Sequence, residues 1–157
     1  MKRDAFAPLS LEDIKALAND AIPTLLSVVE ERADAIDGTF MDIARKLPEG
    51  WRQVVMAARA LEGIEDTECL AGAFTDLRRP KHVRDVEQLF QSIGARKLAA
   101  AFADAREHTS VLVDEDMDPL DVDELRDVTA EELELRAARG ALVKRALALT
   151  APFPAAR

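Results

Sequence analysis

The sequence predicts an all-α protein, a single compact bundle of about seven helices that forms one domain over residues 1–157. Apolar residues recur at spacings of three and four along most of the chain, and the alternation typical of strands is sustained nowhere. Hydrophobic residues make up 48% of the chain, aromatic residues only 4%, and tyrosine is absent. This composition favours alanine-rich helix packing over a β-sandwich.

Capping residues, proline and glycine divide the first half of the chain into four expected helices. Ser10 and Asp13 have the spacing of a capping box that opens the first helix. Thr39 is placed to cap the third, and we expect the fourth to stop at Gly63. The expected spans are 10–18, 23–38, 39–47 and 51–63.

The second half predicts four further helical segments. Asp66 or Thr67 is expected to cap the first of these, and Pro80 to lie beyond its end. Thr129 and Glu132 have the spacing of a second capping box, which opens the last helix. That helix is expected to bury residues 133, 137, 142, 143, 146 and 147. The expected spans are 67–79, 83–94, 98–105 and 129–152.

The cysteine content, the N-terminal stretch and the lack of long apolar runs predict a cytoplasmic location. The single cysteine, Cys69, excludes an internal disulfide and suits a reducing compartment. The stretch MKRDAFAPLSLED has two basic residues but lacks the apolar segment of a signal peptide. No apolar run approaches the roughly 18 residues that a membrane-spanning helix needs. We therefore expect a cytoplasmic protein with no membrane association.

Negative charge is concentrated in one part of the chain. The net charge is −9, from 30 acidic and 21 basic residues. Residues 114–134 hold eleven acids and one base, and the other 136 residues hold nineteen acids and twenty bases. We call residues 114–134 the acidic segment. Because binding to nucleic acid or to an anionic membrane needs a basic surface, neither is expected as a direct partner.

Part of the acidic segment matches the ligand pattern of a calcium-binding EF-hand loop. Asp114, Asp116 and Asp118 occupy positions 1, 3 and 5 of an EF-hand loop. Position 6 is Pro119 where the loop needs glycine, and position 12 is Leu125 where it needs a bidentate glutamate. The two most diagnostic positions fail, so we expect neither a metal site nor a cofactor.

No other motif indicates catalysis. His82, His108 and Cys69 are isolated from one another, and the six glycines form no phosphate-binding loop. A non-enzymatic protein is therefore expected, and an enzyme with a carboxylate site is a remote alternative. In the basic stretch 78–84, Arg78 and Arg79 are interpreted as lying in the last turn of a helix, where the dipole favours cations. The basic stretch could also pair with the acidic segment, within one chain or between two.

Two stretches resemble a known family: LPEGWRQVVMAARALEG at 47–63 and EQLFQSIGARKLAAAFADARE at 87–107. With the part between them, they are similar to the bacterial DNA-mimic protein family, acidic all-helical proteins of about this length. The family usually has an Asn-Gly-Gly-Phe-type motif where this chain has LAGAF at 70–74. The residues that carry the resemblance are Leu47, Pro48, Arg52, Glu62, Phe74, Leu89, Ile93, Gly94, Ala95, Leu98 and Ala105.

The resemblance implies a protein that presents carboxylates to the DNA-binding face of a basic partner protein. Two alternatives remain: a solvated acidic loop with no binding role, and a helical structural module that self-associates, for example as a homodimer. An exposed apolar patch around Trp51, Phe90 or Phe102 would favour self-association. The candidate partner-binding residues are Asp114, Glu115, Asp116, Asp118, Asp121, Asp123 and Glu124.

Overall fold

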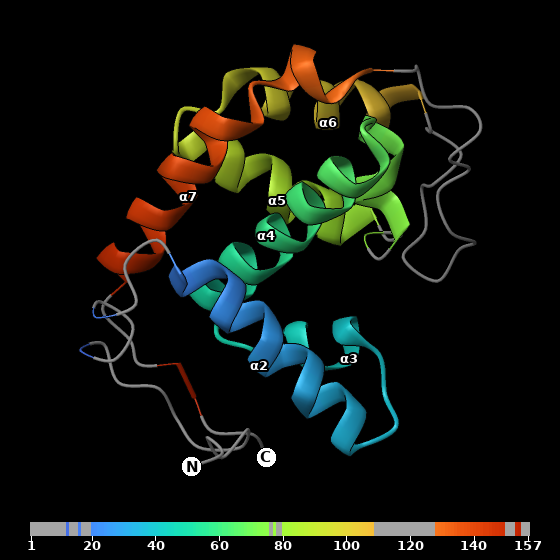
Figure 1. Ribbon diagram of the computed structural model, residues 1–157. Helices are drawn as coiled ribbons and strands as arrows, with labels where there is room; N and C mark the ends of the chain where they lie inside the picture. Colours follow the sequence, from blue (N-terminus) through green and yellow to red (C-terminus); the bar gives the residue numbers. More distant parts are fainter. Residues whose placement is uncertain are drawn as a thin grey trace. The chain divides into compact units, whose positions relative to one another are not determined.

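The computed structural model describes residues 20–75, 77, 80–108, 128–149 and 153–154, together with Glu12 and Ala16 (Figure 1). These residues confirm the all-α class: they contain no strand, and the expected number of about seven helices is approximate. No helix among them is both long and apolar enough to cross a bilayer. The α-helices are α2 (Ala21–Ala35), α3 (Phe40–Ala44), α4 (Glu49–Thr67), α5 (Pro80–Ser92), α6 (Arg96–His108) and α7 (Leu135–Ala148), with 3-10 helices η2 (Leu70–Thr75) and η4 (Ala130–Leu133).

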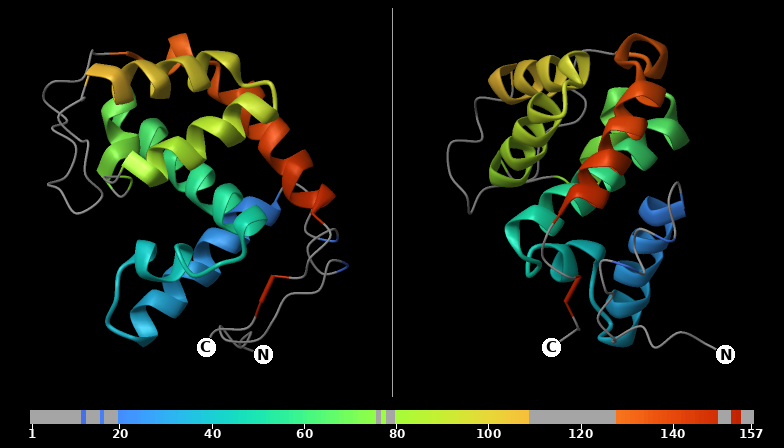
Figure 2. Two further views of the ribbon diagram at one scale, coloured as in Figure 1. Left: turned by 180° about the vertical axis from the view of Figure 1, so that it is seen from behind. Right: turned by 90° about the vertical axis from the view of Figure 1, so that its left-hand side faces the viewer.

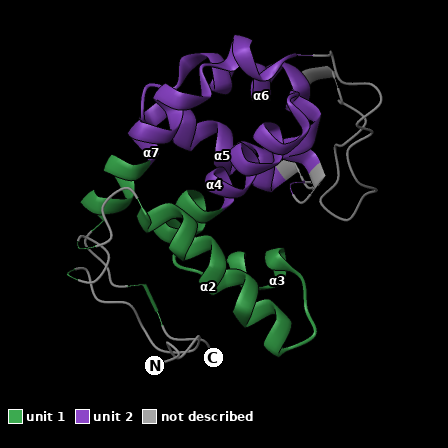
Figure 3. Cartoon of the chain, viewed as in Figure 1, with its two compact units in different colours: residues 1–55, 143–157 green, residues 56–142 purple. Residues whose placement is uncertain are grey.

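The chain groups into two compact units (Figure 3). Unit 1 comprises residues 1–55 and 143–157, and unit 2 comprises residues 56–142. The boundaries fall within helices, so α4 and α7 each contribute residues to both units. The expectation of a single domain stays a prediction, and each unit is described by itself.

The core of unit 1 is built around two aromatic rings. Trp51 and Phe153 are both almost fully buried and meet edge to face, with ring centroids 5.5 Å apart. The guanidinium of Arg32, on α2, lies 5.0 Å from the centroid of the Phe153 ring. Arg32 is the one charged side chain among the described residues that is buried, and the ring face offers it an attractive cation–π contact. Buried aliphatic residues of α2 complete this core.

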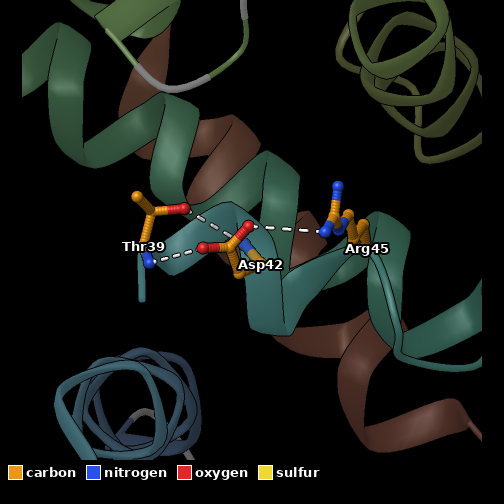
Figure 4. A network of polar contacts seen from close by, with 3 residues as sticks. All are labelled: Thr39, Asp42 and Arg45. Carbon is orange, nitrogen blue, oxygen red and sulfur yellow. Dashed lines mark hydrogen bonds and ion pairs between the residues drawn. The ribbon is translucent and has the colours of Figure 1, made fainter. Parts of the chain in front are cut away.

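Thr39 caps α3, as the sequence predicts, and Asp42 completes a capping box with it (Figure 4). The Thr39 N–H donates to Asp42 Oδ2 at 2.8 Å, and the Asp42 N–H donates to Thr39 Oγ1 at 3.2 Å. The hydrogen bond from the Thr39 backbone, followed by that from its side chain, lowers the pKa of Asp42 below the ordinary 3.8. Arg45, 3.5 Å away, contributes less.

Two other predictions concern the first forty residues: the end of a helix near Gly38 and a capping box at Ser10. The helix expected to end near Gly38 ends three residues earlier, at Ala35. Asp37 has a φ of 53°, and the Gly38 N–H donates to the Ala33 carbonyl at 2.9 Å, which closes the last turn. The capping box of Ser10 and Asp13 lies outside the described residues.

The core of unit 2 is a cluster of three phenylalanines. Phe102 on α6 contacts Phe74 on η2 and Phe90 on α5, with centroid distances of 5.4 and 5.5 Å. α5 and α6 lie side by side (Figure 2). The Arg106 guanidinium also donates to both carboxylate oxygens of Glu87, at 2.9 and 3.3 Å, and joins the two helices.

Gly63 does not stop a helix, contrary to the sequence prediction. α4 continues to Thr67, and at Gly63 its backbone meets the backbone of Gly72 on η2. A Cβ atom on either glycine would lie well inside the 3.0 Å below which such contacts are essentially never found. The Thr67 hydroxyl donates to the Gly63 carbonyl at 2.8 Å. Gly63 therefore allows α4 and η2 to pack closely and does not end a helix.

Two further boundaries in the second half were predicted wrongly. Asp66 and Thr67 do not cap a helix, because both lie in the last turn of α4. Pro80 lies beyond the end of η2, as expected, but it is also the first residue of α5, which was expected to begin at residue 83. At that first position the N–H that proline lacks would have no intrahelical partner.

The last helix differs from the prediction at residue 137, and Val143 and Leu147, also expected to be buried, are only half-buried. Ala137 is exposed and Ala138 is buried in its place, whereas Leu142 and Ala146 are buried as expected.

The basic stretch 78–84 is described only in part. η2 ends at Thr75 and α5 begins at Pro80, so Lys81 and Arg84 are exposed near the N-terminal end of α5. The helix dipole disfavours cations there. Arg78 and Arg79 lie outside the described residues.

The close contact at Gly63 predicts a sharp contrast between two glycine substitutions. Gly63→Ala should lower the free energy of unfolding by about 3 kcal/mol or more, since the new methyl group meets the Gly72 carbonyl oxygen. Gly140→Ala, in α7 with nothing within 4 Å of the added Cβ, should raise it by about 0.5–1 kcal/mol. Urea unfolding followed by circular dichroism measures both. Equal effects at the two positions would contradict the contact.

Phe153→Ala should destabilise the protein by about 3–5 kcal/mol, because it removes a fully buried ring from the core of unit 1. Phe153→Leu keeps an apolar side chain and should forfeit two aromatic contacts: the pairing with Trp51, about 0.5–1.5 kcal/mol, and the cation–π contact with Arg32, up to about 2 kcal/mol. Trp51 is the only tryptophan, so its fluorescence during urea unfolding reports on this core. Unfolding midpoints for Phe153→Ala that equal those of the unmodified protein would show that Phe153 does not pack there.

Asp42 should contribute to the acid dependence of stability. Its pKa is lower in the folded chain than the ordinary 3.8, so its stabilising contribution is present above that pH and is lost as the pH falls through the folded value. Asp42→Asn cannot titrate. The change in unfolding free energy between neutral pH and pH below 3.8 should therefore be smaller in this variant. Identical changes in the two proteins would argue against the capping box.

Candidate binding surface

The seven candidate partner-binding residues all lie outside the described part of the chain. The structure describes the acidic segment only from Val128 to Glu134. We call residues 128–134 the foot of the acidic segment. The residues outside the described part are Asp114, Glu115, Asp116, Asp118, Asp121, Asp123 and Glu124.

The foot belongs to unit 2. An antiparallel β-bridge between Cys69 and Thr129 joins it to the residues that follow α4. The Leu70 N–H donates to the Val128 carbonyl at 2.9 Å, and the Ala130 N–H donates to the Glu68 carbonyl at 3.0 Å. The bridge follows α4 directly, and Glu68 reaches it with a φ of 60°. It pairs residues about sixty positions apart, so no local sequence pattern could have indicated it.

The second predicted capping box is confirmed at the foot. Thr129 and Glu132 form it, with the Thr129 N–H donating to Glu132 Oε2 at 3.3 Å. It opens the short 3-10 helix η4 and not the long last helix that was expected. Leu133 of η4 is only 3% exposed and anchors the foot in the core of unit 2.

Glu134 separates η4 from α7. Its backbone is left-handed, with φ 53° and ψ 50°, so the helix expected to run unbroken from residue 129 is interrupted here. Its carboxylate lies 3.2 Å from Lys97 Nζ, at the N-terminal end of α6. Both side chains are more than half exposed, so this ion pair contributes at most about 1 kcal/mol.

Two of the three acids in the foot therefore take part in the fold. Glu132 accepts a backbone hydrogen bond and Glu134 pairs with Lys97. Glu131 is exposed to solvent. The fold thus uses two acids at the anchored end of the acidic segment as structural groups.

A shallow hollow of about 110 Å³ lies beside the foot. The turn at 93–95, the first residues of α6 and the start of α7 surround it. Arg96, Lys97 and Glu134 are its charged lining residues, and small alanines form most of the rest. It contains a single carboxylate, that of Glu134.

The described residues bring together no group of three His, Cys, Asp or Glu side chains that could hold a metal ion. Cys69 is a free, half-buried thiol whose Sγ lies 3.6 Å from Thr67 Oγ1. His82 lies half-buried on α5, and His108 is the last residue of α6. These three residues are thus placed on different elements. The metal-loop positions Asp114, Asp116, Asp118, Pro119 and Leu125 lie outside the described residues.

Comparison with known proteins finds no matching family model, curated protein or solved structure. Five of the eleven residues that carry the resemblance stated above belong to the core. Leu47, Phe74, Leu89, Leu98 and Ala105 are buried. Gly94 adopts a φ of 82° between α5 and α6, a conformation that favours glycine.

If the foot is integral to unit 2, Leu133→Ala should lower the free energy of unfolding by about 2–5 kcal/mol, because it removes a buried side chain. Glu131→Gln, two residues away and exposed, should change it by less than about 0.5 kcal/mol. Thermal or urea unfolding compares the two. Little effect from Leu133→Ala would mean that η4 does not dock on unit 2.

Proposed function

We propose that the protein is a non-enzymatic binding protein that uses its acidic segment to capture a basic protein, in the manner of a DNA mimic. One observation carries the proposal: residues 114–134 have a net charge of −10, and the rest of the chain has a net charge of +1. A charge separated so completely from the rest of a sequence is suited to electrostatic recognition of a cationic surface.

If it were extended, the stretch 114–124 would carry negative charge at a somewhat lower linear density than a nucleic acid strand, but of the same order. A DNA strand carries one negative charge per roughly 3.4 Å of axis. An extended chain advances roughly 3.3–3.6 Å per residue, and residues 114–124 hold seven acids. Arginine and lysine side chains that normally contact phosphates could bind carboxylates at this spacing. The proposed partner is therefore a DNA-binding protein, and not DNA itself.

The anchoring of the foot supports this function. The bridge at Thr129 and the burial of Leu133 tie one end of the acidic segment to a folded unit. Fixing that end lowers the conformational freedom that is lost when a partner binds. The described acids of the foot, apart from Glu131, already have partners within the chain. We therefore assign the main binding role to residues 114–124.

Self-association gains no support from the aromatic residues. Trp51, Phe90 and Phe102 are each at most 1% exposed, so they form no apolar surface patch. Ile36 is the exposed large hydrophobic residue among those described, at 51%. A single such residue is normal for a protein surface.

Neutralising the acidic segment tests the proposal. Asp114, Asp116, Asp118, Asp121 and Asp123 are replaced together by asparagine, and the purified protein is used to capture partners from a cell lysate. The unmodified protein should retain DNA-binding proteins at low salt, release them at high salt, and lose them to added duplex DNA. The variant should retain none. Unchanged capture by the variant would refute the proposal.

A matched control separates local charge from net charge. Five exposed acids outside the acidic segment are replaced by their amides, which raises the net charge from −9 by the same five units. This control should capture partners as the unmodified protein does, and circular dichroism should show that both variants are folded. Equal loss of capture in the two variants would mean that only total charge matters. The control positions are Asp20, Glu31, Asp34, Asp37 and Asp66.

A further inference from the structure

We draw no further inference here: the strongest candidate, the hollow beside the N-terminal turn of α6 with Arg96, Lys97 and Glu134 in its lining, rests on a helix N-terminus with exposed cations, and no second observation among the described residues points to a ligand.

Discussion

Unit 2 depends on the contact between two glycine backbones. Where Gly63 of α4 meets Gly72 of η2, neither position has room for a side chain. The contact brings η2 against α4, and Thr67 then bonds to the carbonyls of Gly63 and Cys69. The residues that follow pair with the foot of the acidic segment. The anchoring of the foot thus depends on a packing contact that carries no charge.

Helix class and most core faces could be predicted from the sequence because both follow from local apolar spacing. The errors have a common physical origin. Gly63 and Pro80 are ambiguous residues: glycine ends helices but also permits close approach, and proline follows helices but also begins them. Only the tertiary partner decides between these roles. The bridge at Thr129 and the Lys97–Glu134 pair join distant parts of the chain, so local sequence could not reveal them. The binding residues remain a prediction from charge alone.

Charges in unit 2 follow tertiary pairing more closely than the helix dipole. α6 begins with Arg96 and Lys97, and α7 has no acid in its first turn, although the dipole favours acids at both places. Instead, Lys97 pairs with Glu134, and Arg139 near the start of α7 pairs with Glu65 near the end of α4. Each exposed pair is weak, but each joins different elements.

The bridge between Cys69 and Thr129 would also link the proposed binding to folding. If a partner binds the acidic segment only while the foot is docked, then occupancy of the segment stabilises unit 2 by mass action. Partner at one hundred times its dissociation constant would add about 2.7 kcal/mol. By the same linkage, any change that loosens the foot weakens capture without altering a single binding carboxylate.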